Sequence, residues 1–347
     1  MQTPQSLGYR MPAEWEQHES TWLSWPKDPL TFPPGIIEKV ESVYVEMVTA
    51  LSEGEVVNIL VDDEKAERRV RGMVADDPNV LLHRMKTADV WMRDYGPIFV
   101  VGKDVAATKW SFNAWGNKYE ELLPDNRAGS EVASMAAERV FEPGIVLEGG
   151  SIDVNGRGSC LTTEQCLLNR NRNPNLSRLE IEEYLRDYLG VTNLVWLKRG
   201  IAGDDTDGHV DDLARFVGRN KVLCMVAEDL NDENHDALHE NLLALRRAKD
   251  ENGGELELVE LPMPQKRVGP SERLPASYAN FYIGNSVVLV PTFDDHNDEF
   301  ALESLEGLFP GRRVVGLNCE PLVYGFGGIH CVTQQQPAAS LTMVPSV

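Results

Sequence analysis

The segment Tyr324-Gly-Phe-Gly-Gly-Ile-His-Cys331 places a single thiol directly after a glycine-rich turn. Glycine permits positive φ angles and lets the backbone come close to a ligand. A thiol presented in this way is a candidate nucleophile when a base or a cation lies near it. The same string also fits a tight turn followed by a small buried residue, because free cysteine often packs as an apolar side chain. The rest of the chain has to decide between these interpretations.

Three other segments each bring titratable groups to the start of an expected strand, beside a glycine. They carry Asp94, then Glu148, then the pair His209 and Asp211. If the fold repeats, equivalent positions in each repeat point toward one axis. We therefore expect these four side chains to meet Cys331 in one site.

Three members of this set match an activated thiol. His209 is expected to act as the base for Cys331, and Glu148 is expected to orient the imidazole. Cysteine hydrolases that attack amides need hydrogen-bond donors around the oxyanion and not additional negative charge. The composition of the set therefore disfavours a protease.

The two remaining carboxylates, Asp94 and Asp211, suit a planar guanidinium group. Its N–H groups match carboxylate oxygens bidentately. Trp91, together with Trp110 or Trp115, is expected to stack on the cation. The pattern thus predicts attack on a guanidinium carbon.

Four segments with an apolar strand, a Gly/Asn/Asp turn and a second apolar strand recur along the chain. They span 97–107, 151–161, 213–223 and 280–290. A strand at 56–61 with its following helix is counted as a fifth unit, after a helix expected at 36–51. Because no linker separates these units, we predict a single α/β domain over residues 1–347, built as a closed ring of repeats.

Together these motifs resemble the agmatine deiminase family, which is grouped with the bacterial-type peptidylarginine deiminases of the guanidine-modifying, or pentein, superfamily. The resemblance covers residues from about 10 to about 337 and rests on the following motifs: Met11-Pro-Ala-Glu-Trp-Glu-Gln-His-Glu-Ser-Thr-Trp-Leu-Ser-Trp-Pro, Trp91-Met-Arg-Asp-Tyr-Gly-Pro, Glu148-Gly-Gly-Ser-Ile-Asp, Thr206-Asp-Gly-His-Val-Asp, Pro275-Ala-Ser-Tyr-Ala-Asn-Phe-Tyr-Ile and Gly327-Gly-Ile-His-Cys.

The resemblance implies a pentein fold, a pseudo-fivefold α/β propeller of ββαβ-type repeats. It implies Cys331 as nucleophile, His209 as general acid and base, and Asp94 and Asp211 as holders of the guanidinium. Glu148 would support the site by hydrogen bonding. No metal and no organic cofactor is implied.

The activity implied by the resemblance is hydrolytic deimination of agmatine to N-carbamoylputrescine and ammonia, through a Cys331 thiouronium. Deimination of peptidylarginine or of free arginine is the alternative. An amidinotransferase or a non-catalytic polyamine-binding protein is a remoter one. Phe326 departs from the unbroken glycine run that is usual before Ile-His-Cys, and we expect it to line the channel for the substrate tail.

Several other residues have plainer interpretations. Cys160, Cys166 and Cys224 are expected to be structural. Asp204 and Asp205 fit a solvated turn, although either is also placed to meet a substrate amine. His330 follows the same turn as the nucleophile, and we expect it to point away from the site.

Composition limits the possible partners. The formal net charge of -22 disfavours nucleic-acid binding, which needs a basic patch, and suits a small cationic guanidinium substrate. Five widely spaced cysteines argue against a disulfide framework. No apolar run is long enough for a membrane span and the N-terminus does not resemble a signal peptide, so a cytoplasmic location is expected. Whether the protein forms a homo-oligomer is left open.

Overall fold

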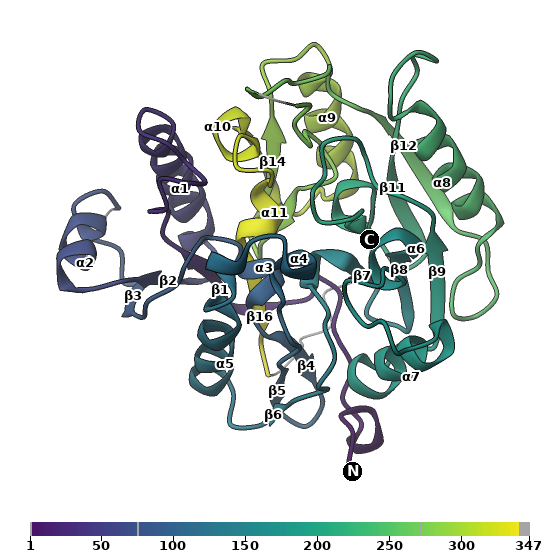
Figure 1. Cartoon of the computed structure of the whole chain (residues 1–347), viewed down its shortest axis with the longest axis horizontal. Helices are drawn as coiled ribbons and strands as arrows, with labels where there is room; N and C mark the ends of the chain where they lie inside the picture. The colour runs from purple at the N-terminus through teal and green to yellow at the C-terminus, as the bar shows by residue number, and fades with distance from the viewer. Residues whose placement is uncertain (1, 75, 271, 340–347) are drawn as a thin grey trace.

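The computed structural model of the chain describes residues 2–74, 76–270 and 272–339. Its strands form five separate small sheets, one of four strands and four of three strands. The longer helices lie toward the outside of the molecule, and the short helix α11 lies near its middle (Figure 1). The structure is thus the mixed α/β fold expected from the sequence; closure of the sheets into a propeller stays a prediction.

The four three-stranded sheets share one pattern, which is an antiparallel hairpin followed by a third strand parallel to the hairpin's second strand. All four predicted hairpins are confirmed. The sheets comprise β4 (Ile98–Val101), β5 (Val105–Thr108) and β6 (Val140–Phe141); β7 (Ile152–Val154), β8 (Ser159–Thr163) and β9 (Asn193–Leu197); β10 (Ala214–Phe216), β11 (Lys221–Val226) and β12 (Glu257–Pro262); and β13 (Tyr282–Ile283), β14 (Val287–Thr292) and β15 (Arg313–Asn318).

The remaining sheet joins the two ends of the described chain. Its order is β16 (Gln334–Pro337), β1 (His18–Ser24), β2 (Val56–Val61) and β3 (Val80–Arg84). Strand 56–61, predicted as the start of a fifth unit, is therefore preceded in that sheet by β1 and β16. The sequence Gln-Gln-Gln-Pro of β16 has no apolar alternation, so periodicity could not reveal it. Its pairing with β1 depends on a long-range contact.

Helices connect the strands and cover them. They are α1 (Ile37–Ser52), α2 (Glu64–Arg71), α3 (Met92–Tyr95), α4 (Ala114–Asn117), α5 (Asp125–Ala136), α6 (Glu164–Leu167), α7 (Arg178–Leu189), α8 (His235–Arg247), α9 (Asp298–Leu308), α10 (Glu320–Val323) and α11 (Ile329–Val332). In α1 the apolar side chains at helical spacing are buried, as expected for an amphipathic helix. Helix α7 begins with the capping box of Ser177 and Glu180.

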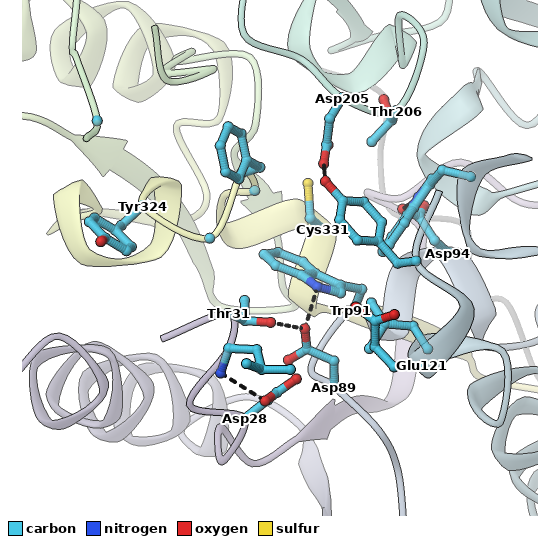
Figure 2. Close-up of a pocket in the computed structure, with 18 of the residues that line it drawn as sticks. Asp28, Thr31, Asp89, Trp91, Asp94, Glu121, Asp205, Thr206, Tyr324 and Cys331 are labelled. Atoms are coloured by element: carbon cyan, nitrogen blue, oxygen red, sulfur yellow. Dashed lines mark hydrogen bonds between the residues drawn. The ribbon is translucent and has the colours of Figure 1, made fainter. Parts of the chain in front are cut away.

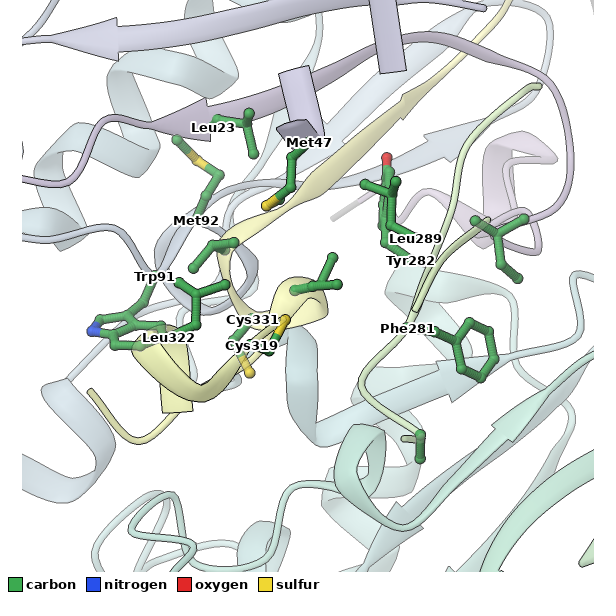
Figure 3. Close-up of a cluster of buried hydrophobic side chains, with 14 of the residues drawn as sticks. Leu23, Met47, Trp91, Met92, Phe281, Tyr282, Leu289, Cys319, Leu322 and Cys331 are labelled. Carbon is green, nitrogen blue, oxygen red and sulfur yellow. The ribbon is translucent and has the colours of Figure 1, made fainter. Parts of the chain in front are cut away.

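Cys331 lies at the edge of the largest apolar cluster of the core. Figure 3 shows it near Trp91, Leu322 and Cys319, beside the end of β16. Such surroundings remove water from the thiol and disfavour its charged form. Among the residues that the structure describes, no helix is long and apolar enough to cross a membrane.

Candidate active site

The predicted nucleophile, Cys331, lines a pocket of about 270 Å³. Figure 2 shows Cys331 Sγ projecting into it, with Trp91 and Asp205 on different sides. The wall also contains Asp94 and Trp115. Three of the six predicted site residues, Cys331, Asp94 and Trp91, therefore line one cavity.

Two glycines allow the chain to present Cys331 in this way. A Cβ on Gly327 would lie 2.2 Å from the ring of Trp91, and a Cβ on Gly328 would lie 2.5 Å from Asn280 Oδ1. The turn therefore needs glycine for close approach, as the sequence suggested. Burial raises the pKa of Cys331 well above its usual value, and the carboxylates of Asp211, Asp212 and Asp94 raise it further.

Asn280 holds the nucleophile and was not singled out from the sequence. Its Nδ2 donates to Cys331 Sγ at 3.2 Å and to Asp212 Oδ1 at 3.0 Å, while its Oδ1 accepts from the backbone N–H of His330 at 2.9 Å. The amide N–H is thus placed to stabilise a thiolate. The only sequence signal for it was its place inside one of the family-like motifs.

Asp94 is fixed through both oxygens. Oδ1 accepts from the backbone N–H of Gly150 at 3.0 Å, and Oδ2 accepts from Trp115 Nε1 at 2.9 Å. Trp115 has a φ of 52°, a left-handed conformation that a bulky residue rarely adopts unless its surroundings impose it. Burial raises the pKa of Asp94, an effect that His209 partly offsets and that Asp211 and Glu148 increase.

His209 and Asp211 meet Asp94 around Gly150. A Cβ at Gly150 would lie 2.6 Å from His209 Nδ1, 2.9 Å from Asp211 Oδ2 and 3.0 Å from Asp94 Oδ1. His209 Nδ1 itself is 3.7 Å from Asp94 Oδ1. Although burial lowers the pKa of His209, the charges of Asp94 and Asp211, together with Cys166, raise it well above its usual value. These charges therefore favour the protonated form of the imidazole.

Asp204 shapes the loop that delivers His209. Its Oδ1 accepts from the backbone N–H of Thr206 at 2.8 Å, and its Oδ2 accepts from the backbone N–H groups of Gly208 at 2.8 Å and His209 at 3.1 Å. This residue is therefore a loop-organising acceptor. Asp205, in contrast, lines the pocket and accepts from the Tyr119 hydroxyl at 2.6 Å.

Glu148 lies beside His209 but is bonded to Arg172. Its Oε1 accepts from Arg172 Nε at 2.6 Å, and within the described part of the chain its Oε2 has no hydrogen-bond partner. Its expected role in supporting His209 stays a prediction. Cys166, expected to be structural, is the third member of this neighbourhood, and nothing in the sequence placed it there.

His330 reaches the site indirectly. Its ring lies between Asp211 Oδ2, 2.7 Å from Nδ1, and Glu14 Oε2, 2.8 Å from Nε2. The side chain does not line the pocket. Its bond to Asp211 nevertheless connects it to a predicted substrate-binding carboxylate. Burial opposes ionisation of Asp211, but the hydrogen bond and charge of His330 lower its pKa overall.

The three tryptophans expected near the cation are now distinguished. Trp91 lines the pocket, with its Nε1 donating to Asp89 Oδ2 at 2.8 Å. Trp115 also lines it. Trp110 belongs to a separate apolar cluster, where its ring packs edge-on against Tyr188. Of these two alternatives only Trp115 lines the pocket, and its stacking on the cation stays a prediction.

Comparison with known proteins places these features in a family. The family model described as Porphyromonas-type peptidyl-arginine deiminase matches residues 10–337. The chain belongs to this family.

Phe326, where the chain departs from the expected glycine run, lines the pocket and has a φ of 71°.

Relatives within this deiminase family match nearly the whole chain. The agmatine deiminase of Pseudomonas aeruginosa is 38% identical over 363 residues, which cover 97% of each chain. The solved agmatine deiminase of Enterococcus faecalis is 33% identical, has a TM-score of 0.91 and covers 98% of this chain and 99% of its own. DDAH from Pseudomonas aeruginosa shares the fold at 13% identity and a TM-score of 0.54.

Proposed function

We propose that this protein hydrolyses agmatine to N-carbamoylputrescine and ammonia. One observation supports agmatine in particular: among the described residues that line the pocket, there are six carboxylates and no lysine or arginine. The carboxylates are Asp28, Asp89, Asp94, Glu121, Asp205 and Glu272. A pocket with this composition favours a substrate that is cationic at both ends. The names of the relatives reported above support the same substrate.

Free arginine is disfavoured because its α-carboxylate needs a cation. Arg93 is buried behind the site, where it donates to Gln335 Oε1 at 2.7 Å and pairs with Glu14 at 3.4 Å. Lys118 donates to Asp207 Oδ1 at 2.8 Å. Neither side chain belongs to the pocket wall, so nothing in the described wall balances a substrate carboxylate.

Two further carboxylates are placed to receive the substrate's primary ammonium group. Burial raises the pKa of Asp89 to about 7 and that of Asp205 to about 6. At Asp89 no cation offsets burial, and at Asp205 the charges of Lys118 and His209 offset it only in part, so neither group has a fully compensating cation. A bound ammonium would supply one, which supports a role for this wall in recognising the agmatine tail.

In the first half of the proposed reaction, Asp94 and Asp211 hold the guanidinium, and Cys331 attacks its carbon. Burial, together with the carboxylates of Asp211, Asp212 and Asp94, raises the pKa of the thiol, so we infer that it is neutral before substrate binds. The incoming cation offsets those charges, so the thiol loses its proton to solvent when substrate binds. Protonated His209 then donates its proton to the departing nitrogen, ammonia leaves, and a Cys331 thiouronium remains.

In the second half, neutral His209 accepts a proton from water as the water attacks the thiouronium carbon. Collapse of the resulting adduct expels the Cys331 thiolate and forms the ureido product. Asn280 Nδ2, 3.2 Å from Sγ, is placed to donate to the thiolate as it leaves. Every step uses side chains of this chain and one water molecule.

The other expectations stay proposals. We infer that the five sheets form the pseudo-fivefold propeller of the pentein fold, which the repeated sheet pattern supports. A single domain and a cytoplasmic location stay predictions, and whether the protein forms a homo-oligomer stays open. Peptidylarginine, which the family description names, is the second substrate to test.

The experiment compares agmatine, free arginine and an arginyl peptide, with ammonia and ureido product as readouts. We expect turnover of agmatine with a kcat/KM well above that of the other two. Cys331→Ala should lose about 10⁴-fold or more in kcat. Mass spectrometry of enzyme quenched during turnover should find the adduct on the peptide that carries Cys331. A faster reaction with the arginyl peptide would reassign the substrate, and no turnover of any guanidine would refute the proposal.

A further inference from the structure

Glu148, Cys166 and His209 together offer three possible metal ligands, and the proposed reaction does not use all of them. One ligand atom from each residue lies within 4.8 Å of the other two, and all three residues are buried. The reaction needs His209 for proton transfer, but it gives Cys166 no task. Buried thiols placed beside an imidazole and a carboxylate have the composition of metal sites.

The relative placement of Cys166 and His209 is fixed by one hydroxyl group. Thr163 Oγ1 accepts from the backbone N–H of Cys166 at 3.1 Å and donates to the carbonyl oxygen of Gly208 at 2.6 Å. Thr163 thereby ties the start of α6 to the loop that carries His209. Backbone hydrogen bonds therefore keep the segments that carry the thiol and the imidazole next to each other.

Unpartnered polar atoms point to a missing ligand. Within the described part of the chain, Glu148 Oε2 and both ring nitrogens of His209 are buried without a hydrogen-bond partner at normal distance, and the Cys166 thiol, within 4.8 Å, interacts with the imidazole. Side-chain exposure is 0% for Glu148 and 1% for His209. Leaving such atoms unsatisfied costs about 1–3 kcal/mol each. A bound cation would satisfy one atom on each residue.

The ligand set also selects the kind of cation. A thiolate, an imidazole and a carboxylate suit Zn²⁺ and other thiophilic divalent ions, whereas Mg²⁺ and Ca²⁺ require oxygen ligands. At metal–ligand distances of about 2.0–2.3 Å the ligand atoms of a tetrahedral site lie about 3.3–3.8 Å apart. The ligand atoms therefore have to approach one another by up to about 1 Å to hold the ion. The fourth position is left for water.

The charges around this cluster favour a cation. The carboxylates of Asp94 and Asp211 lie beside His209 around Gly150, with Asp94 Oδ1 3.7 Å from His209 Nδ1, and their negative charge attracts a divalent ion. The nearby guanidinium of Arg172 opposes it, but Arg172 also pairs with Asp207 at 2.7 Å. The pocket is close to this cluster, because its wall includes Asp94, which lies 3.7 Å from His209 Nδ1.

We propose that Glu148, Cys166 and His209 form a reversible inhibitory site for a thiophilic divalent cation such as Zn²⁺. Binding releases two protons to solvent, one from the Cys166 S–H group and one from the His209 ring, so that a metal–thiolate bond forms and a His209 nitrogen supplies its lone pair. The metal thereby removes the imidazole from proton transfer and leaves Cys331 uncoordinated. The inhibitory consequence rests on the proposed function, whereas the binding itself does not.

The test measures binding and inhibition separately. Cd²⁺ is titrated into the wild-type protein and the ultraviolet thiolate-to-metal charge-transfer band is recorded, with Zn²⁺ binding followed by calorimetry. We expect one metal ion per chain at this site. Cys331→Ala should keep the band, and Cys166→Ala should lose it and weaken Zn²⁺ binding at least about tenfold. Cys166→Ser, which keeps the volume of the side chain, replaces Cys166→Ala if that variant does not fold.

Inhibition of agmatine turnover by Zn²⁺ is then compared with each variant's own metal-free rate. We expect the half-inhibitory concentration to rise at least about tenfold in Cys166→Ser. His239→Ala is the matched control, because the stacked rings of His235 and His239 are a second set of nitrogen ligands on α8. This control should leave inhibition unchanged.

Three outcomes would overturn the proposal. One is loss of the band in Cys331→Ala with retention in Cys166→Ala, which would show chelation by the nucleophile. The second is the absence of tight Zn²⁺ binding to wild-type protein. The third is binding that disappears only in His239→Ala. If no guanidine is turned over but the Cys166-dependent band is present, the proposed function fails and the metal site stands.

Discussion

The two sides of the candidate active site treat their carboxylates in opposite ways. Behind the nucleophile, Glu14 contacts Arg215 at 3.0 Å, Arg93 at 3.4 Å and His330 at 2.8 Å. In front, the carboxylates of the pocket wall have no lysine or arginine among the described residues that line it. The arginines and His330 around Glu14 balance its negative charge, whereas no lysine or arginine of the pocket wall balances the carboxylates in front.

The pKa directions follow this difference. Burial opposes ionisation of Glu14, but Arg215, His330 and Arg93 outweigh it and lower the pKa well below its usual value. Burial instead prevails at Asp94 and Asp89, whose pKa values are raised. Both sides are buried, so the presence of cationic partners makes the difference. The ion pairs behind the nucleophile stabilise the fold around the site. The carboxylates in front are placed to bind a cationic substrate.

The largest expected effect comes from breaking the ion pairs around Glu14. Glu14→Gln leaves two buried guanidinium groups short of a counter-charge, so we expect a loss of about 3–5 kcal/mol in the free energy of unfolding. Denaturant unfolding at neutral pH measures it. Glu53→Gln is the matched control, because Glu53 pairs with Arg313 at the surface and should cost less than about 1 kcal/mol. Equal effects of the two substitutions would contradict the comparison.

The next largest effect is expected from a substitution that displaces the side chains in front of the nucleophile without removing any functional group. Gly150→Ala places a methyl group against Asp94, His209 and Asp211. We expect kcat/KM to fall about 100-fold, because displacements of about 1 Å at reacting groups have that cost. Steady-state assays with agmatine measure it. Gly307→Ala, in α9 with open space around its Cβ, is the control and should keep full activity.

A smaller effect is expected at the tail-binding wall. The pKa of Asp205 is raised to about 6, so this group is anionic above that pH and neutral below it. We therefore expect kcat/KM for agmatine to fall as the pH decreases through about 6. Asp205→Asn should lower kcat/KM about tenfold at neutral pH and remove that part of the pH dependence. Its amide oxygen still accepts from Tyr119.

Butylguanidine, which lacks the primary amine, provides the control for Asp205. Its kcat/KM should not change in Asp205→Asn, because no tail ammonium is present. A similar loss with both substrates would mean that Asp205 supports the site in another way.

The smallest effect concerns Phe326, whose backbone conformation at the front of the site is strained. Its φ of 71° is unfavourable for any residue with a Cβ. Phe326→Gly should therefore be more stable than Phe326→Ala by about 0.5–1 kcal/mol. Both variants should raise KM for agmatine a few-fold, since both remove the same part of the pocket wall. Thermal unfolding and KM together check this, and a more stable alanine variant would contradict the strain.

Much of the fold was predictable because its signals are local. Each of the four hairpins combines alternating apolar residues with Gly, Asn or Asp at the turn, and all four formed as expected. Strand β16 was not predictable, since its glutamines carry no periodic signal. Its position follows from pairing with β1, more than 300 residues away along the chain: His18 lies opposite Pro337.

The candidate site divides in the same manner. Cys331, Asp94, His209 and Asp211 could be predicted because each has a reactive group beside a glycine, in motifs that resemble one family. Asn280 and Cys166 could not be assigned a role, because an amide or a thiol in an apolar segment is chemically silent until its neighbours are known. Their roles appear only as distances, such as the 3.2 Å between Asn280 Nδ2 and Cys331 Sγ.

The sequence by itself therefore determined the kind of chemistry: a thiol, an imidazole and two aspartates select a guanidinium carbon. Only the tertiary structure decided which carboxylates are neutralised. Glu14, with three partners, and Asp94, with a raised pKa, are both simply acidic residues in the sequence. The physical reason is that ionisation of a buried group depends on charges a few ångströms away. Those charges come from segments that are distant in the chain, and folding alone brings them together.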